Sequence, residues 1–245
     1  MIEHIGSVDS ELRDKLIYSS FFELIIERNS LGQDVLTGLM EYSLDHLLMK
    51  GLGENGTDTV FTRAFTTLLM ALILYRDGEE PFLSDDLFAR ASKDLMNYFM
   101  DEKDLRGYVP EKGWAHSVAH ASDAIDEMVK HPKFDRKLYP EILKLLLDKV
   151  LISESVYIHK EDERILHPIL RMLAEGLDAG EVETLLQSLP ERLREQKQEL
   201  LPEHYYFLEF NCAAFLKTFY LKLEDRSETG SLQETIRELW EIIGK

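Results

Sequence analysis

Apolar residues recur at the spacing of an α-helix along almost the whole chain. Leu12 and Leu16 show this spacing near the start, and Leu232 and Ile236 show it near the end. No window shows the sustained apolar–polar alternation that is typical of a half-buried strand. Gly, Pro, Asn and Asp residues interrupt the apolar pattern at short intervals, as they do where helices end and begin. The pattern therefore predicts an all-α chain of about ten helices joined by short links.

These helices are expected to pair as helical hairpins that begin near residues 9, 57, 113, 161 and 203. The intervals are slightly longer than the roughly 40–47 residues of helical solenoid repeats. The number and pairing of the helices favour an α–α superhelix of the HEAT or armadillo type over a closed bundle. No linker or shift in composition divides the chain, so we expect residues 1–245 to form a single domain.

Two helices stand out as buried. Residues 60–75 form the most apolar window, which contains Arg63 and is shorter than the ~20 residues that span a bilayer. We interpret it as a buried helix and not as a membrane span. The helix after Pro202 is rich in aromatic residues and apolar on nearly every side, so we expect other helices to cover it.

The charge and the cysteine content limit the partners and the compartment. The formal net charge of −18 disfavours binding to nucleic acids or to anionic membranes, since both would be repelled. Cys212 is the single cysteine, and no basic stretch followed by an apolar run opens the chain. We therefore expect a cytoplasmic protein whose partners are small molecules, peptides or proteins.

The segment from Asp104 to Lys130 holds the densest group of chemically reactive residue types. On a helical wheel for residues 113–130, Trp114 lies on an apolar stripe. The opposite stripe is polar and consists of His116, His120, Asp123 and Glu127. Small residues flank the polar stripe, so neighbouring helices can approach closely and leave it as a narrow strip. In a superhelix, such a helix would face the concave groove.

The two histidines of this stripe have more than one interpretation. His116 and His120 are one turn apart and could share a metal ion, with Asp123 as a third ligand. The glutamate that follows the first histidine in helical metalloproteases is missing. A general base oriented by Asp123 is a second possibility, and a hydrogen-bonded polar face without chemistry is a third.

Two arginines extend the candidate site. Arg106 could clamp a carboxylate or a phosphate, or it could pair with Asp104 and hold the loop in place. Arg63 requires a carboxylate partner if its helix is buried. The acids of segment 161–163 open a later helix, where the helix dipole favours them. One of these acids could reach Arg63 or the histidines.

Four sequence blocks together resemble a known family. They are Thr-Arg-Ala-Phe (62–65), Asp-Leu-Arg-Gly-Tyr (104–108), Gly-Trp-Ala-His-Ser-Val-Ala-His-Ala-Ser-Asp (113–123) and Glu-Asp-Glu-Arg (161–164). In this order, over about residues 30 to 220, they resemble the signature blocks of the bacterial family named domain of unknown function 2785. Ala64 stands where the family often has Ser. The resemblance implies an all-helical cytosolic bacterial protein without an established activity.

The resemblance also implies a shared functional pocket, because polar signature residues in four segments are hard to explain by packing alone. The matching positions are Arg63, Arg106, Gly107, Gly113, Trp114, His116, His120, Asp123, Asp162 and Arg164. Phosphate-binding Gly-rich loops, a Gly-x-Ser-x-Gly elbow and a Cys-x-x-Cys pair are missing from the sequence, so familiar nucleotide and hydrolase chemistries lose weight.

Three functions remain open from the sequence. The first is a binding protein whose concave groove holds a small polar ligand or a peptide. Its candidate lining residues are Arg63, Arg106, Trp114, His116, His120, Asp123, Glu161, Asp162 and Arg164. The second is a metal-dependent hydrolase in which His116, His120 and Asp123 or Glu161 hold a divalent cation. The third is a protein-interaction scaffold of the HEAT type, in which the polar stripe is purely structural.

Overall fold

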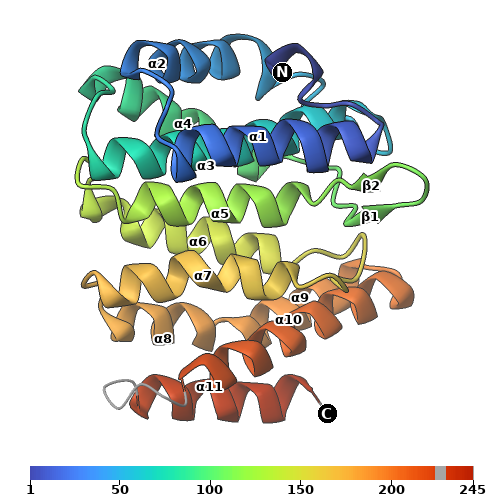
Figure 1. Cartoon of the computed structure of the whole chain (residues 1–245). Coiled ribbons are helices and arrows are strands. Elements are labelled where there is room, and N and C mark those ends of the chain that lie inside the picture. Colours follow the sequence, from blue (N-terminus) through green and yellow to red (C-terminus); the bar gives the residue numbers. More distant parts are fainter. Residues whose placement is uncertain (224–229, 245) are drawn as a thin grey trace. The chain divides into compact units, whose positions relative to one another are not determined.

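The computed structural model describes residues 1–223 and 230–244, and almost all of its regular structure is helical (Figure 1). The predicted all-α fold is confirmed. The described residues include one pair of strands, each of two residues. The chain divides into two compact units, residues 1–135 and 136–245, which are described one at a time. The single domain and the superhelix stay predictions.

The first unit begins with a long helical segment. After the short turn η1 (Ile2–His4), η2 (Glu11–Tyr18), α1 (Ser19–Phe22) and η3 (Glu23–Glu27) follow one another without a break. In η2 and η3 the backbone has the wider hydrogen-bond spacing of a π-helix. A second segment consists of α2 (Gln33–Tyr42) and η4 (Ser43–Leu47).

Helix α3 (Thr59–Glu79) is the centre of the first unit. It packs along α5 (Ser117–Val129) and also contacts α1, α2 and the three π-helical segments. Among the described helices, α3 is the one long and apolar enough to cross a membrane, but 83% of the apolar window is buried inside the protein. A core helix of a soluble protein has this property, so the predicted buried helix is confirmed.

Helix α4 (Asp85–Asp101) leads from α3 to the candidate site. Ser84 caps its start, where the Ser84 hydroxyl accepts a hydrogen bond from the amide of Leu87 at 3.2 Å. The helix ends at Asp101, and Glu102 is its C-cap residue. The chain then forms β1 (Tyr108–Val109) and β2 (Gly113–Trp114), which pair antiparallel with Tyr108 opposite Trp114. This hairpin leads directly into α5.

The described residues of the second unit form η5 (Arg136–Leu138) and six α-helices. These are α6 (Tyr139–Val150), α7 (Glu161–Ala174), α8 (Ala179–Gln187), α9 (Leu189–Glu199), α10 (Pro202–Leu223) and α11 (Gly230–Ile243). Helix α10 is central and contacts α6, α7, α9 and α11. Contrary to the prediction, the described residues leave one side of α10 uncovered, because its neighbours pack on the side that carries Leu208, Phe215 and Phe219.

Candidate functional site

Arg63 is fully buried in α3 and uses its guanidinium to join three segments of the first unit. Its Nε and Nη2 atoms donate to the two carboxylate oxygens of Glu102, at 2.7 and 2.9 Å. Its Nη1 atom donates to the carbonyls of Lys50 and Gly51, at 2.8 and 2.9 Å. Burial alone would lower the pKa of Arg63, but the hydrogen bonds and charge of Glu102 raise it above its ordinary value. The required carboxylate partner is therefore Glu102, the C-cap residue of α4.

Arg106 holds the loop that follows α4. Its Nε and Nη2 atoms donate to the carboxylate of Asp104, at 2.8 and 2.6 Å, and Nη2 also donates to the carbonyl of Thr57 at 2.7 Å. Asp104 is fully buried and accepts a further hydrogen bond from the amide of Gly56 at 3.0 Å. The pairing of Arg106 with Asp104, one of the two possibilities left open by the sequence, is thus present. Ligand contact by Arg106 stays a prediction.

Arg13 anchors the hairpin and was not found by sequence reasoning. It is fully buried in η2, and its Nη2 atom donates to the carbonyls of Lys112 and Trp114 at 2.8 and 3.3 Å. Its guanidinium lies 4.3 Å from the centre of the Phe61 ring. Burial lowers the pKa of Arg13, against the raising effect of Asp14 at 2.8 Å. No motif marks Arg13, because its partners in the hairpin lie about a hundred residues away in sequence.

His116 ends the extended chain of the hairpin and precedes α5. Its backbone is left-handed, with φ 50° and ψ 37°, and its amide donates to the carbonyl of Arg106 at 3.0 Å. The amide of Ala115 likewise donates to the carbonyl of Gly107 at 2.8 Å. Left-handed backbone costs a residue with a side chain roughly 1–2 kcal/mol. The hairpin bonds hold His116 in this conformation.

This geometry corrects the helical wheel. The wheel placed Trp114 on the stripe opposite His116, but the Trp114 ring lies against the His116 ring with the centres 4.4 Å apart and the planes at 31°. The wheel is wrong for Trp114 because α5 begins only at Ser117 and Trp114 belongs to the strand β2. For the helical part the wheel holds, since Val118, Ile125 and Met128 are all buried.

Five rings form a continuous series from the surface to the core of the first unit, which we term the aromatic row. The row consists of Tyr108, Trp114, His116, His120 and Phe65, with successive ring centres 4.4 to 5.7 Å apart. Tyr108 and Trp114 are 51% and 38% exposed, whereas His120 and Phe65 are buried. The edge-to-face contacts between most neighbours are those that aromatic rings prefer. The row therefore presents two exposed rings that are packed, through His116, onto two buried rings.

The predicted metal ligands lie at the inner part of this row. The rings of His116 and His120 are in contact at nearly right angles, with their centres 5.7 Å apart. His120 also packs edge-to-face against Phe65 of α3, and Asp123 is half-buried one turn further along α5. A metal ion held by these three residues stays a prediction.

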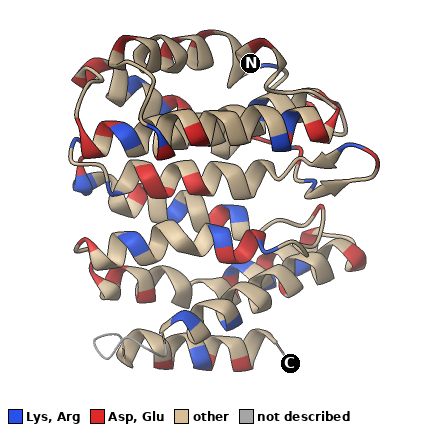
Figure 2. Ribbon diagram, viewed as in Figure 1, with Lys and Arg blue, Asp and Glu red and all other residues tan. Residues whose placement is uncertain are grey.

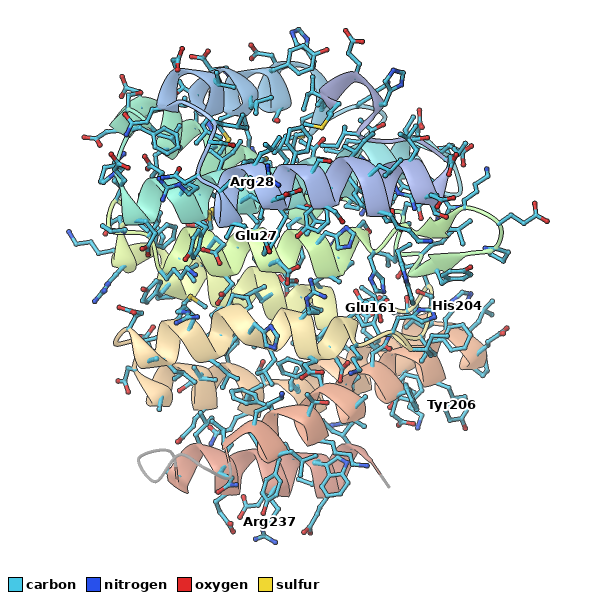
Figure 3. All side chains as sticks on the ribbon, in the orientation of Figure 1. Glu27, Arg28, Glu161, His204, Tyr206 and Arg237 are labelled. Atoms are coloured by element: carbon cyan, nitrogen blue, oxygen red, sulfur yellow. The ribbon has the colours of Figure 1, made fainter. Side chains whose placement is uncertain are left out.

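The acids of segment 161–163 belong to the second unit and open α7 as predicted. Glu161, labelled in Figure 3, is buried and accepts a hydrogen bond from the amide of His159 at 2.8 Å. Asp162 accepts a hydrogen bond from Thr218 of α10 at 2.6 Å, and Glu163 pairs with Lys222 at 2.6 Å. Arg164 follows in the first turn of α7. The predicted approach of this segment to Arg63 or the histidines stays a prediction.

One family model matches the sequence of this chain. The model of the family described as protein of unknown function (DUF2785) matches residues 48–221. The chain belongs to this family. The family match includes α3, the hairpin, α5 and most of α10, and it confirms the resemblance seen in the four sequence blocks. No curated protein and no solved structure matches the chain.

Within the family-matched region of the first unit, the arginines and the exposed rings have different surroundings. The guanidinium groups of Arg63 and Arg106 bind carboxylates and backbone carbonyls of the chain itself. Tyr108 and Trp114 instead expose a large part of their rings. Chemically, this arrangement is a fixed loop that presents flat aromatic surfaces beside an imidazole.

Proposed function

We propose that this protein binds a small polar ligand or a peptide on the surface formed by Tyr108, Trp114 and His116. The observation that carries the proposal is the exposure of Tyr108 and Trp114 on a hairpin held by the buried Arg13 and by the ion pair of Arg106 with the buried Asp104. Rigid aromatic side chains supply much of the energy of many binding sites. A loop that is ordered before binding also loses little entropy when the ligand arrives.

The predicted site residues take different roles in this proposal. Trp114 and His116 contact the ligand, and Tyr108 joins them although sequence reasoning did not select it. Arg63 and Arg106 hold the hairpin in position, since their guanidinium groups bind the chain itself. His120 and Asp123 continue the polar side along α5. The proposal does not need the concave groove or the segment 161–164.

The charges near the hairpin favour a ligand with a cationic or neutral polar group. Lys112 pairs with Asp58 at 2.6 Å, and Arg106 pairs with Asp104. Glu111, between the two strands, is exposed and forms no ion pair with any residue that the structure describes. Aromatic faces attract cations, and the net charge of −18 repels anions. A peptide that carries Lys or Arg would therefore suit this surface.

Fluorescence of Trp114 tests the proposal. The chain has two tryptophans, so Trp240→Phe leaves Trp114 as the single reporter. We expect end-blocked peptides with Lys or Arg to give a saturable change in emission and to raise the midpoint of thermal unfolding. The same peptides with Glu at those positions should have no effect. Tyr108→Ala should weaken binding about tenfold or more, which corresponds to about 1.4 kcal/mol.

The control is Tyr42→Ala, because Tyr42 has the same exposure as Trp114 but lies on α2. Equal weakening by both substitutions, or no saturable change with any peptide, would contradict the proposal. Zinc and manganese ions form a separate set of probes. A saturable response to either ion that disappears in a His116→Ala/His120→Ala variant would favour the metal-dependent hydrolase instead.

A further inference from the structure

Helix α10 carries an exposed apolar stripe along one side. Tyr206, Phe210 and Leu221 are 65%, 53% and 52% exposed, and Figure 3 shows Tyr206 pointing away from the helices of its unit. Exposed or half-buried residues recur every three or four positions, as on one face of a helix. We term these residues the α10 stripe: Glu203, Tyr206, Phe210, Ala213, Ala214, Lys217 and Leu221.

The size of the α10 stripe distinguishes it from scattered exposed residues. It extends over about 18 residues, which is about 27 Å of α-helix. Single exposed apolar residues are normal, but a continuous apolar surface marks an interaction site in soluble proteins. Ala213 and Ala214 lie between the large side chains, and their small size allows another helix to come close.

The charges of one α10 stripe are complementary to the charges of a second copy of the stripe. Glu203 lies near one end and Lys217 nearer the other, with Phe210 midway between them at seven residues from each. Both charged residues are exposed, and neither forms an ion pair with any residue that the structure describes. Lys222, in contrast, is already paired with Glu163. The stripe thus presents one free acid and one free base at equal distances from a central aromatic ring.

A second copy of the helix in antiparallel orientation fits this pattern. Glu203 would then face Lys217 of the partner subunit, and the symmetry would form the same pair a second time. Phe210 would lie on the two-fold axis, with Tyr206 over the small residues of the opposite stripe. A parallel orientation would place like charges opposite each other. Self-complementarity of one surface is the requirement for a two-fold symmetric dimer.

We propose that this protein forms a homodimer through antiparallel packing of its α10 stripes. The α10 stripe lies entirely in the second unit, so the proposal uses no residue of the surface formed by Tyr108, Trp114 and His116. The exposed side of a single helix is smaller than the roughly 800 Å² per partner of a standard interface. The dimer is therefore weak, with a dissociation constant on the order of micromolar.

Sedimentation equilibrium of the full chain, over a concentration range around that value, tests the dimer. Phe210→Glu places a charge on the two-fold axis and should weaken dimerisation about a hundredfold or more. The control is Leu16→Glu, which puts the same charge at a 57% exposed apolar residue of η2 and should leave the dimer unchanged. Thermal unfolding checks that both variants are folded.

Exchange of the two charges provides the sharper test. Glu203→Lys and Lys217→Glu should each weaken the dimer about tenfold, because each places like charges opposite one another at two symmetric positions. The double variant Glu203→Lys/Lys217→Glu should restore the wild-type affinity. A wild-type chain that stays monomeric, a double variant that remains as weak as the single ones, or equal dissociation by Leu16→Glu would overturn the proposal.

Discussion

At the scale of single residues, a buried ion pair holds the loop that carries the candidate site. Arg63 and Glu102 form a bidentate ion pair inside the first unit, with both side chains almost completely buried. Such a pair adds little to stability over well-packed apolar side chains, because both charges lose their hydration. Loss of one partner is costly, since the other charge stays buried without compensation. The pair therefore makes the position of the 104–117 loop sensitive to one substitution.

We expect Glu102→Ala to lower the free energy of unfolding by about 3–5 kcal/mol, because it leaves the Arg63 charge buried without its carboxylate. Urea denaturation measures the change. The matched control is Asp45→Ala, which removes the acid of an exposed pair with Arg90 at the same distance of 2.7 Å. Its cost should stay below about 1 kcal/mol. Similar costs for both variants would mean that the buried pair is not a special constraint.

A second buried cluster of the first unit joins the end of α3 to the segment after α5. The Nδ1 atom of His131 accepts the amide hydrogen of Lys133 at 3.1 Å, so its Nε2 atom carries the proton that faces Asp77 at 2.9 Å. The ring stacks on Phe88 with the centres 4.4 Å apart. Burial lowers the pKa of His131, although the charge of Asp77 opposes this effect.

The lowered pKa of His131 predicts a pH dependence with a definite sign. The unfolded chain takes up the proton first as the pH falls through about 6.5, so the folded protein loses stability there. The stability advantage of the wild type over His131→Gln should therefore shrink between pH 7.5 and 5.5. Urea denaturation at several pH values measures it. An advantage that stays constant or grows would show that His131 does not resist protonation in the folded protein.

At the scale of elements, contacts between helices depend on side chains at the closest points. The N-terminal segment passes so near α3 that a Cβ atom on Gly6 would lie 2.1 Å from Thr62 Oγ1 and 2.6 Å from Thr62 Cα. At Gly38, in the middle of α2, no atom beyond the adjacent residues and the backbone of its own helix lies within 4 Å of the corresponding position. The two glycines thus differ in the space around them.

The same substitution should have opposite effects at these two glycines. Gly6→Ala should destabilise the protein by about 1–3 kcal/mol, because the Thr62 backbone cannot move away without shifting α3. Gly38→Ala should stabilise it by about 0.5–1 kcal/mol, because alanine loses less conformational freedom in a helix. Midpoints of urea or thermal unfolding measure both changes. Stabilisation by Gly6→Ala would contradict the close approach of the N-terminal segment.

Several helices begin at residues that are typical of helix starts, and two helices differ from the prediction. Ser84 caps the start of α4, and Pro190 and Pro202 lie in first helical turns. Helix α5 begins later than predicted, because the amides of residues 115 and 116 bond to the preceding loop. Helix α10 is apolar on nearly every side, but the described residues of its own unit cover only part of it. That uncovered side is the basis of the proposed dimer.

At the scale of the whole molecule, acidic and basic residues occur in both units. Figure 2 shows Asp and Glu on helices of both units, with Lys and Arg placed among them. The excess of acids keeps copies apart at long range, which favours solubility. A dimer under this repulsion requires local opposite charges at its interface, as Glu203 and Lys217 would supply. The family match also extends over both units, from residue 48 to residue 221.

The sequence by itself determined the helical class, the burial of α3, several helix starts and the family. These properties depend on the spacing of apolar residues and on caps within a few residues, so they are written locally in the chain. It also located the segment that carries the candidate site. It did not determine which neighbour covers each face, because periodicity reveals an apolar side without its partner.

Only the tertiary structure decided the contacts between distant segments. Glu102 binds Arg63 across 39 residues, and Arg13 reaches the carbonyl of Lys112 across 99 residues. Neither contact has a spacing that a sequence pattern could reveal, since each depends on how the helices pack. Trp114 lies beside His116 for the same reason, because hydrogen bonds to residues 106 and 107 keep it out of the helix. Trp114, which was predicted to lie on the apolar stripe of a helix, is therefore part of an exposed aromatic surface.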